Sequence, residues 1–137
     1  ADVVGEGVPC VMHSNATTYS PEECAREIYE RAPFVEEPGT TWSYHSLHLQ
    51  IAGAMAAKAA NVSVKKLLDT YLLKPLGMHG SFWLGHPNPH LAAAMISNGN
   101  DYDKLLRAVL NYELLPKSII DKMEKDYTSA PVKPSNF

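Results

Sequence analysis

Residues 38–46 read Pro-Gly-Thr-Thr-Trp-Ser-Tyr-His-Ser and lead directly into an alanine-rich segment that ends at residue 60. Proline followed by glycine predicts a sharp turn. Beyond the turn, apolar residues recur at three- and four-residue spacings, which predicts a helix over about 46–60. Tyr44 therefore lies just before a helix N-terminus. A tyrosine hydroxyl in that position is a candidate proton acceptor, provided that a neighbouring cation and the helix dipole stabilise its anionic form.

A second helix is expected upstream of this turn. Ser20 and Glu23 form a capping box, and Pro21 occupies the first helical position between them. This combination predicts a helix that begins at Ser20 and extends to about Arg31.

Three more helices are expected downstream: one capped by Ser63, one capped by Asn100 over 101–111, and one that starts at Pro116. The apolar faces of the five helices are, in order, Cys24 and Ile28; Leu47, Ile51, Ala54, Met55, Lys58 and Ala59; Val64, Leu67, Leu68, Tyr71 and Leu72; Leu105, Leu106, Val109 and Leu110; and Ile119, Ile120 and Met123. No segment shows convincing strand alternation, although the short run 91–96 is compatible with a helix or a strand.

We therefore predict an all-α fold of about five helices with long loops, held together by side-chain packing. The 137 residues fit a single domain, with an irregular lead-in at 1–19 and an extended tail at 129–137. The composition, 45% hydrophobic and 20% charged, is that of an ordinary globular domain. The net charge of -3 does not indicate a nucleic-acid partner, and no run of residues predicts a membrane span or a signal peptide. The first residue is not methionine, so we expect the chain to be part of a longer protein.

Cys10 and Cys24 are the two cysteines of the chain. A bridge between them would close a loop of about 15 residues and stabilise the fold by about 3 kcal/mol. Asn15 and Asn61 each begin an N-x-[ST] sequon, and Asn15 lies inside the same loop. Together these features favour a secreted glycoprotein with a disulfide. The alternative is a pair of free buried thiols in a reducing cell.

The order of several landmarks resembles the helical domain of the serine β-lactamase-like and penicillin-binding-protein-like hydrolases. That family includes the class C β-lactamases, D,D-peptidases and related esterases. The landmarks cover roughly residues 20 to 130 and are Pro33-Phe34, Glu37-Pro38-Gly39-Thr40, Trp42-Ser43-Tyr44, Leu49 with Ile51-Ala52-Gly53, Leu67-Leu68, Lys74-Pro75-Leu76-Gly77-Met78, Leu91-Ala92-Ala93-Ala94, Asp101-Tyr102 and Leu105-Leu106.

The resemblance implies a two-domain hydrolase that needs no cofactor. In that family an α/β domain carries the nucleophilic serine in a Ser-x-x-Lys helix and a Lys-Thr-Gly strand. The helical domain brings a Tyr-x-Asn motif to the shared cleft, where a small-molecule or peptide-like substrate binds. Tyr44 matches the tyrosine, the general base of the family. Ser46 stands where the pattern has a substrate-binding asparagine, and a serine lacks the donor and acceptor pair of an amide.

The chain itself supplies only part of such a site. Lys-Thr-Gly does not occur in it, and Ser63-Val64-Lys65-Lys66 fits Ser-x-x-Lys only formally, because the family has an ordinary helix start there. We predict that Ser63 is a helix cap. Acyl transfer needs a nucleophile, a base and oxyanion donors, so the isolated chain, without its α/β domain, is expected to be catalytically inactive.

Two alternatives remain open from the sequence. Tyr44 could be a structural aromatic side chain at a turn, packed against Trp42. The whole chain could be a non-catalytic binding or recognition module, a pseudoenzyme on the same scaffold, for which the change of asparagine to Ser46 and the histidine-containing loop are the motivation.

Histidines form two groups that could suggest a metal site. His45 and His48 are three residues apart, and His86 and His90 lie in the segment 79–90, whose glycines and prolines predict a long surface loop. A zinc site needs three or four ligands with supporting partners. Neither group has a cysteine or patterned carboxylates at metal-ligand spacing, so we predict surface histidines and no metal.

Overall fold

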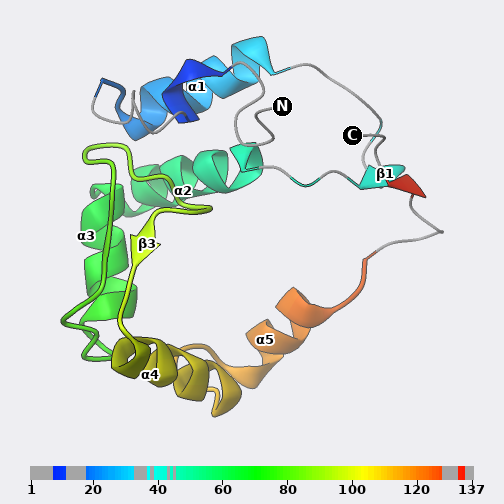
Figure 1. Cartoon of the computed structure of the whole chain (residues 1–137). Coiled ribbons are helices and arrows are strands. Elements are labelled where there is room, and N and C mark those ends of the chain that lie inside the picture. Colours follow the sequence, from blue (N-terminus) through cyan, green and yellow to red (C-terminus); the bar gives the residue numbers. More distant parts are fainter. Residues whose placement is uncertain are drawn as a thin grey trace.

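The computed structural model describes residues 8–11, 18–32, 37, 39–42, 44, 46–127 and 133–134. Five α-helices dominate these residues, which confirms the expected mostly helical fold (Figure 1). They are α1 (Pro21–Arg31), α2 (Leu47–Ala60), α3 (Val64–Leu68), α4 (Gly99–Leu110) and α5 (Lys117–Glu124). A 3-10 turn, η1 (Pro9–Val11), precedes α1, and a π-helical turn, η3 (Asp69–Leu73), continues α3.

Two short strand pairs connect loops. The run 91–96, left open as a helix or a strand, ends in a strand, and the other strands were not expected from the sequence. β2 (Phe82–Trp83) pairs antiparallel with β3 (Met95–Ile96), and β1 (Thr41–Trp42) pairs in parallel with β4 (Lys133–Pro134). Each strand has two residues, which is too short to produce a recognisable alternation. The second pair places a C-terminal segment beside the segment that leads to Tyr44 (Figure 1).

The helix boundaries follow local hydrogen bonding. Ser20 Oγ accepts from the Glu23 N–H (3.2 Å), and the Glu23 carboxylate accepts from the Ser20 N–H (2.8 Å), so the predicted capping box is present. The Ser20 N–H and hydroxyl hold the pKa of Glu23 below its ordinary value. α2 ends where Asn61 adopts a left-handed backbone with φ 52°.

The cap of α4 differs from the prediction. Asn98 Oδ1, rather than Asn100, accepts the Asp101 N–H (2.9 Å), and the helix begins at Gly99. Asn100 therefore lies inside the first turn. Two asparagines flank Gly99, and the sequence pattern alone does not decide which of them takes the extended cap conformation.

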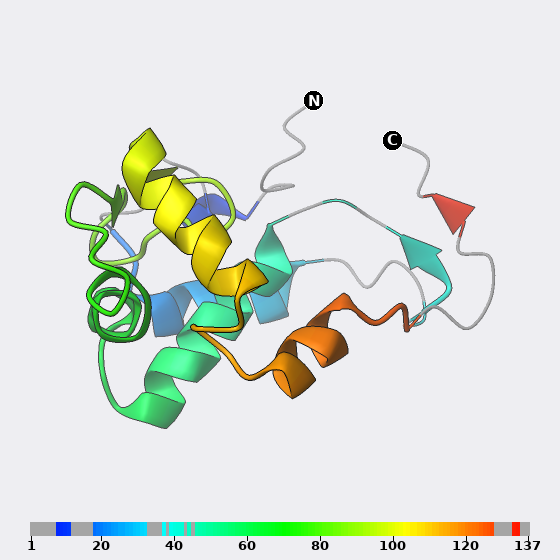
Figure 2. The ribbon, with the colours of Figure 1, turned by 90° about the horizontal axis from the view of Figure 1, so that it is seen from below.

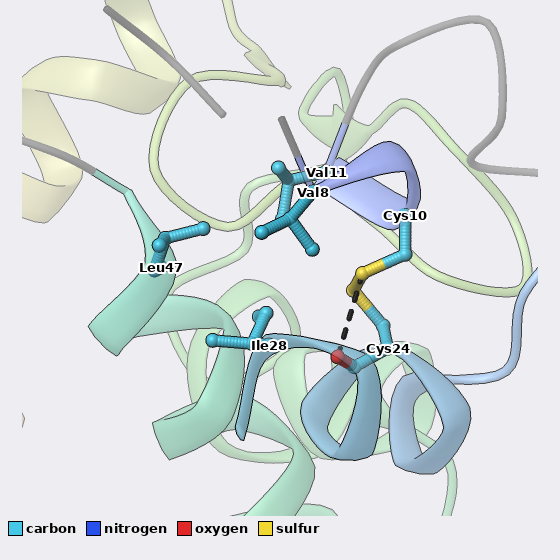
Figure 3. Close-up of a cluster of buried hydrophobic side chains, with 6 residues drawn as sticks. All are labelled: Val8, Cys10, Val11, Cys24, Ile28 and Leu47. Atoms are coloured by element: carbon cyan, nitrogen blue, oxygen red, sulfur yellow. Dashed lines mark hydrogen bonds between the residues drawn. A yellow bond between two sulfur atoms is a disulfide. The ribbon is translucent and has the colours of Figure 1, made fainter. Parts of the chain in front are cut away.

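The core surrounds the disulfide. Cys10 and Cys24 are bridged, as one of the two sequence interpretations expected. The bridge joins η1 to α1 within a cluster of buried side chains (Figure 3), made of Val8, Cys10, Val11, Cys24, Ile28 and Leu47. Leu47 brings the first turn of α2 into this cluster, so one core connects the N-terminal turn, α1 and α2.

A buried amide pair connects this core to a distant loop. Gln50 on α2 donates from Nε2 to Asn88 Oδ1 and to the Pro89 carbonyl, both at 2.8 Å. Its Oε1 accepts the Leu91 N–H (3.1 Å), and Asn88 Nδ2 donates to the Cys10 carbonyl (3.1 Å). Gln50 is 3% exposed and Asn88 1% exposed, so these bonds form away from solvent.

The prediction that 79–90 is a surface loop is therefore wrong at its C-terminal end. Asn88, Pro89 and His90 are buried. The reason is that Gln50 lies on the core side of α2, where its amide must find hydrogen-bond partners, and the loop supplies them.

A second buried polar group, the carboxylate of Asp101 on α4, hydrogen-bonds the segment that leads into β2. Asp101, 3% exposed, accepts hydrogen bonds from Lys104 Nζ (2.9 Å), the Gly80 N–H (2.8 Å) and the Ser81 hydroxyl (3.0 Å). These donors, Lys104 first, hold the pKa of the Asp101 carboxyl below its ordinary value although burial opposes the shift. Asn98 Nδ2 also contacts the carboxylate at 3.4 Å.

Several residues expected on the core faces are exposed instead. The largest departures are Met55 on α2, Tyr71 on η3, Leu106 and Leu110 on α4, and Ile119 and Met123 on α5, with Ala59 of α2 also exposed. On α2 the buried residues are Leu47, Gln50, Ala54 and Ala57. Because α2 is apolar on nearly all sides, periodicity could not identify which side faces the core.

Replacing Gln50 with leucine should strongly destabilise the fold. The change leaves Asn88 Oδ1, the Pro89 carbonyl and the Leu91 N–H without their Gln50 partner, and each buried unpaired group costs about 1–3 kcal/mol. We expect the free energy of unfolding from urea denaturation to fall by about 3 kcal/mol or more. Asn100→Ala, at an exposed position, is the control and should change it by less than about 0.5 kcal/mol. Equal effects of the two variants would contradict the assigned network.

Removing the disulfide in Cys10→Ala/Cys24→Ala should lower the free energy of unfolding by about 3 kcal/mol, because the unfolded chain regains the freedom of the loop. Complete reduction should shift the urea midpoint of the wild-type chain and leave that of the double variant unchanged. A wild-type midpoint that is insensitive to reduction would show that the bridge does not stabilise the fold.

Asp101 should make the fold acid-sensitive. Its pKa is lowered in the folded state, so its stabilisation is complete above the unfolded value of about 3.9 and is lost as the pH falls through the lower folded value. Thermal melts between pH 6 and pH 2.5 should show a decline below about pH 4 that is smaller in Asp101→Asn. Asp103→Asn, with an exposed carboxylate, is the control. A decline in Asp101→Asn as steep as in the wild type would refute the assignment.

Candidate functional site

Tyr44 lies between β1 and α2 and points its side chain into solvent. It is 71% exposed. The segment is held on one side by the pairing of Thr41 and Trp42 with β4, and on the other by the start of α2 at Leu47. A short, doubly anchored segment thus presents the tyrosine at the N-terminal end of a helix. Ser43 and His45, its neighbours, lie outside the described residues.

Ser46 lies in a different environment from Tyr44. It precedes the first residue of α2, and its carbonyl accepts the N–H groups of Leu49 (3.2 Å) and Gln50 (3.3 Å). Its side chain makes no capping bond to the helix backbone, and the residue is 4% exposed. The tyrosine therefore faces outward and the serine faces the interior. A substrate contact by Ser46 stays a prediction.

Ser63 is a helix cap, as predicted. Its Oγ accepts the Lys66 N–H at the start of α3 (3.1 Å). The Lys65 ammonium pairs with Asp69 at 2.5 Å. The hydroxyl is thus engaged in local helix structure, and the formal Ser-x-x-Lys match at 63–66 reflects a helix start.

A pocket of about 160 Å³ lies beside Ser63, between α3–η3 and the segment 82–89. Leu68 and Leu73 line one side, and Phe82 and Trp83 line the other. Sequence patterns could not predict this pocket, because its lining comes from segments that meet only in the folded chain. Tyr44 is not among its lining residues, so it is separate from the tyrosine site.

The remaining sequence candidates are placed as follows. His48 and His86 are exposed and His90 is buried, and no group of three or more metal-ligating side chains gathers within the described part of the chain. Asn61 is exposed at the end of α2, whereas Asn15 lies outside the described residues. Among the helices described, none is long and apolar enough to cross a membrane.

Sequence comparison identifies a family model for this chain. The model, described as Beta-lactamase, matches residues 12–133, which is most of the chain. No curated protein sequence matches this chain.

Three solved structures share the fold. A candidate β-lactamase from Bacteroides dorei DSM 17855 has a TM-score of 0.74 at 24% identity and matches 89% of this chain. The octameric penicillin-binding protein homologue from Pyrococcus abyssi has a TM-score of 0.68 at 20% identity over 93% of this chain. The D-stereospecific amidohydrolase from Streptomyces sp. has a TM-score of 0.68 at 22% identity over 90% of this chain.

The chain is much shorter than these proteins. It covers 39% of the Bacteroides protein, 37% of the Pyrococcus protein and 44% of the Streptomyces protein. More than half of each of them therefore lies outside the part that this chain matches.

Proposed function

The chain belongs to the β-lactamase family, and from this premise we propose that it is the helical domain of a β-lactamase-like serine hydrolase. In this role it supplies one wall of the substrate cleft and the tyrosine of the site. The observation that carries the proposal is the outward-facing Tyr44 at the start of α2, in a chain that matches under half the length of similar proteins.

The chemistry divides between two parts of such a protein. The nucleophilic serine, its lysine and the oxyanion donors come from the remainder of the polypeptide. Tyr44 then acts as the base that takes the proton of the serine hydroxyl. The exposure of Tyr44 supports this assignment, because its hydroxyl must reach a group on another domain. The isolated chain is inactive because a base without a nucleophile cannot transfer an acyl group.

The substrate in this proposal is a small-molecule or peptide-like carbonyl compound. Ser46 is buried and has no amide group. Both features argue against its replacing the asparagine that hydrogen-bonds the substrate in the family pattern. The Cys10–Cys24 bridge suits an oxidising compartment, so we assign the protein to the secretory pathway. The exposed Asn61 is then accessible for glycosylation, and the second candidate, Asn15, lies outside the described residues.

The buried Ser46 also supports a second function, a non-catalytic recognition module on the same scaffold. In that case the surface around Tyr44 binds a partner and catalyses no reaction. The coding region around this chain separates the two: Ser-x-x-Lys and Lys-Thr-Gly sequences in it favour the enzyme, and their loss favours the recognition module.

Hydrolysis assays test the enzyme proposal. The 137-residue chain should not turn over a chromogenic lactam or a nitrophenyl ester above background. The polypeptide extended through its flanking coding region should hydrolyse at least one of them, and Tyr44→Phe should lower kcat/KM by about 100-fold or more, since general-base catalysis contributes that much. Tyr29→Phe, at an 87% exposed position of α1, is the matched control and should have no effect. An extended polypeptide that retains full activity in Tyr44→Phe would refute the role of Tyr44.

A further inference from the structure

The pocket between α3–η3 and the segment 82–89 has no part in the hydrolase proposal. Its volume is about 160 Å³, and Tyr44 is not among its lining residues. Figure 1 shows the segment 82–89 running alongside α3, and in Figure 2, where α3 is seen nearly end-on, the segment again lies beside that helix. The pocket is therefore a second candidate binding site.

The walls of this pocket are mostly apolar. Two leucines of α3–η3 face two aromatic rings and two proline rings of the opposite segment, and these side chains are Leu68, Leu73, Phe82, Trp83, Pro87 and Pro89. An apolar cavity of about 150 Å³ accommodates a benzene-sized molecule. Aromatic rings also attract one another beyond the gain from burial alone. The size and the walls of the pocket therefore fit a single aromatic ring.

The segment 82–89 is anchored at both ends. Trp83 pairs with Met95 in the β2–β3 ladder. At the other end, the Pro89 carbonyl accepts a hydrogen bond from the Gln50 amide (2.8 Å). This wall of the pocket is thus already in place before a ligand binds, which lowers the entropic cost of binding.

The charged side chains at the pocket neutralise each other. The Lys65 ammonium pairs with the Asp69 carboxylate at 2.5 Å. Ser63 Oγ accepts the Lys66 N–H, and His86 is exposed. A charged ligand would lose part of its hydration here without meeting an unpaired opposite charge from Lys65 or Asp69. The pocket therefore favours an uncharged molecule.

Trp83 contributes an unused hydrogen-bond donor to this region. Its indole N–H is buried and has no acceptor among the residues that the structure describes. Buried donors in native proteins are nearly always paired, because an unpaired donor destabilises the fold. A small turn of the indole ring toward the pocket would bring this N–H to an acceptor atom of a bound molecule.

We propose that this pocket binds an uncharged aryl carbonyl compound, a molecule with one aromatic ring and one hydrogen-bond acceptor. The ring packs between the apolar walls, and the Trp83 indole donates to the carbonyl oxygen. The proposal does not depend on the hydrolase function, because no residue of the turn at 38–46 lines the pocket.

Acetophenone is the probe, and the two tryptophan indole signals in a 15N–1H NMR spectrum of the 137-residue chain report its location. Trp42→Phe removes one signal and so identifies that of Trp83. Acetophenone should shift the Trp83 signal saturably, with a Kd of about 1 mM for so small a ligand, and should leave the Trp42 signal unchanged. No shift up to about 20 mM, or a shift confined to Trp42, would overturn the proposal.

Two related molecules test the chemistry of the site. Toluene lacks the acceptor and should bind at least about fivefold more weakly than acetophenone, measured by ligand-observed NMR. Benzoate is charged and should bind at least about tenfold more weakly. In Trp83→Phe, which has no indole N–H, acetophenone and toluene should bind equally. Equal binding of these two to the wild type, or tighter binding of benzoate, would overturn the proposal.

A matched pair of exposed aromatic residues provides the variant test. Phe82, 51% exposed, lines the pocket, so Phe82→Ala should raise the Kd of acetophenone by about tenfold. Tyr71 on η3, 65% exposed, does not line the pocket, and Tyr71→Ala should leave the Kd unchanged. Equal weakening in the two variants would contradict the assigned site.

The polypeptide extended through its flanking coding region should bind acetophenone with a similar Kd. Loss of binding in that longer protein would assign the pocket to a side chain from another part of the polypeptide and would overturn the proposal of a small-molecule ligand.

Discussion

The need of one buried amide for partners determines how this domain is assembled. Gln50 is buried on the core side of α2, where an amide without hydrogen-bond partners would destabilise the fold. Its partners come from the 88–91 loop, and Asn88 passes the connection on to Cys10 and so to the disulfide. Three segments far apart in sequence thus meet at the side chain of Asn88. The orientation of α2, and with it the outward side of that helix, follows from this contact.

Local signals in the sequence were sufficient for the helices and insufficient for their packing. The Ser20 capping box and the Ser63 cap were predictable, because the hydrogen bonds of each join residues within four consecutive positions. The burial of Gln50 and the exposure of Met55 were not, since α2 is apolar around most of its circumference and only its neighbours decide which side is covered. The two-residue strands were also unpredictable, because they exist only through their partners.

In the candidate site, too, local sequence identified a residue, while its environment depended on tertiary packing. The turn at 38–46 identified Tyr44, and the structure places that residue in solvent at the start of α2. The environment of Ser46 could not be foreseen, because its burial depends on how the first turn of α2 enters the core. The motif therefore indicates the parent family, while the direction in which each of its side chains points is a property of the tertiary structure.

The pairing of β1 with β4 has a consequence for the order of folding. Cys10 and Cys24 are close in sequence, so the core around them can form early during synthesis. Thr41 pairs with Lys133, which lies far along the sequence, so this contact can form only after the segment with Lys133 has been synthesised. The β1–β4 contact that holds the tyrosine segment thus forms later than the core around the disulfide.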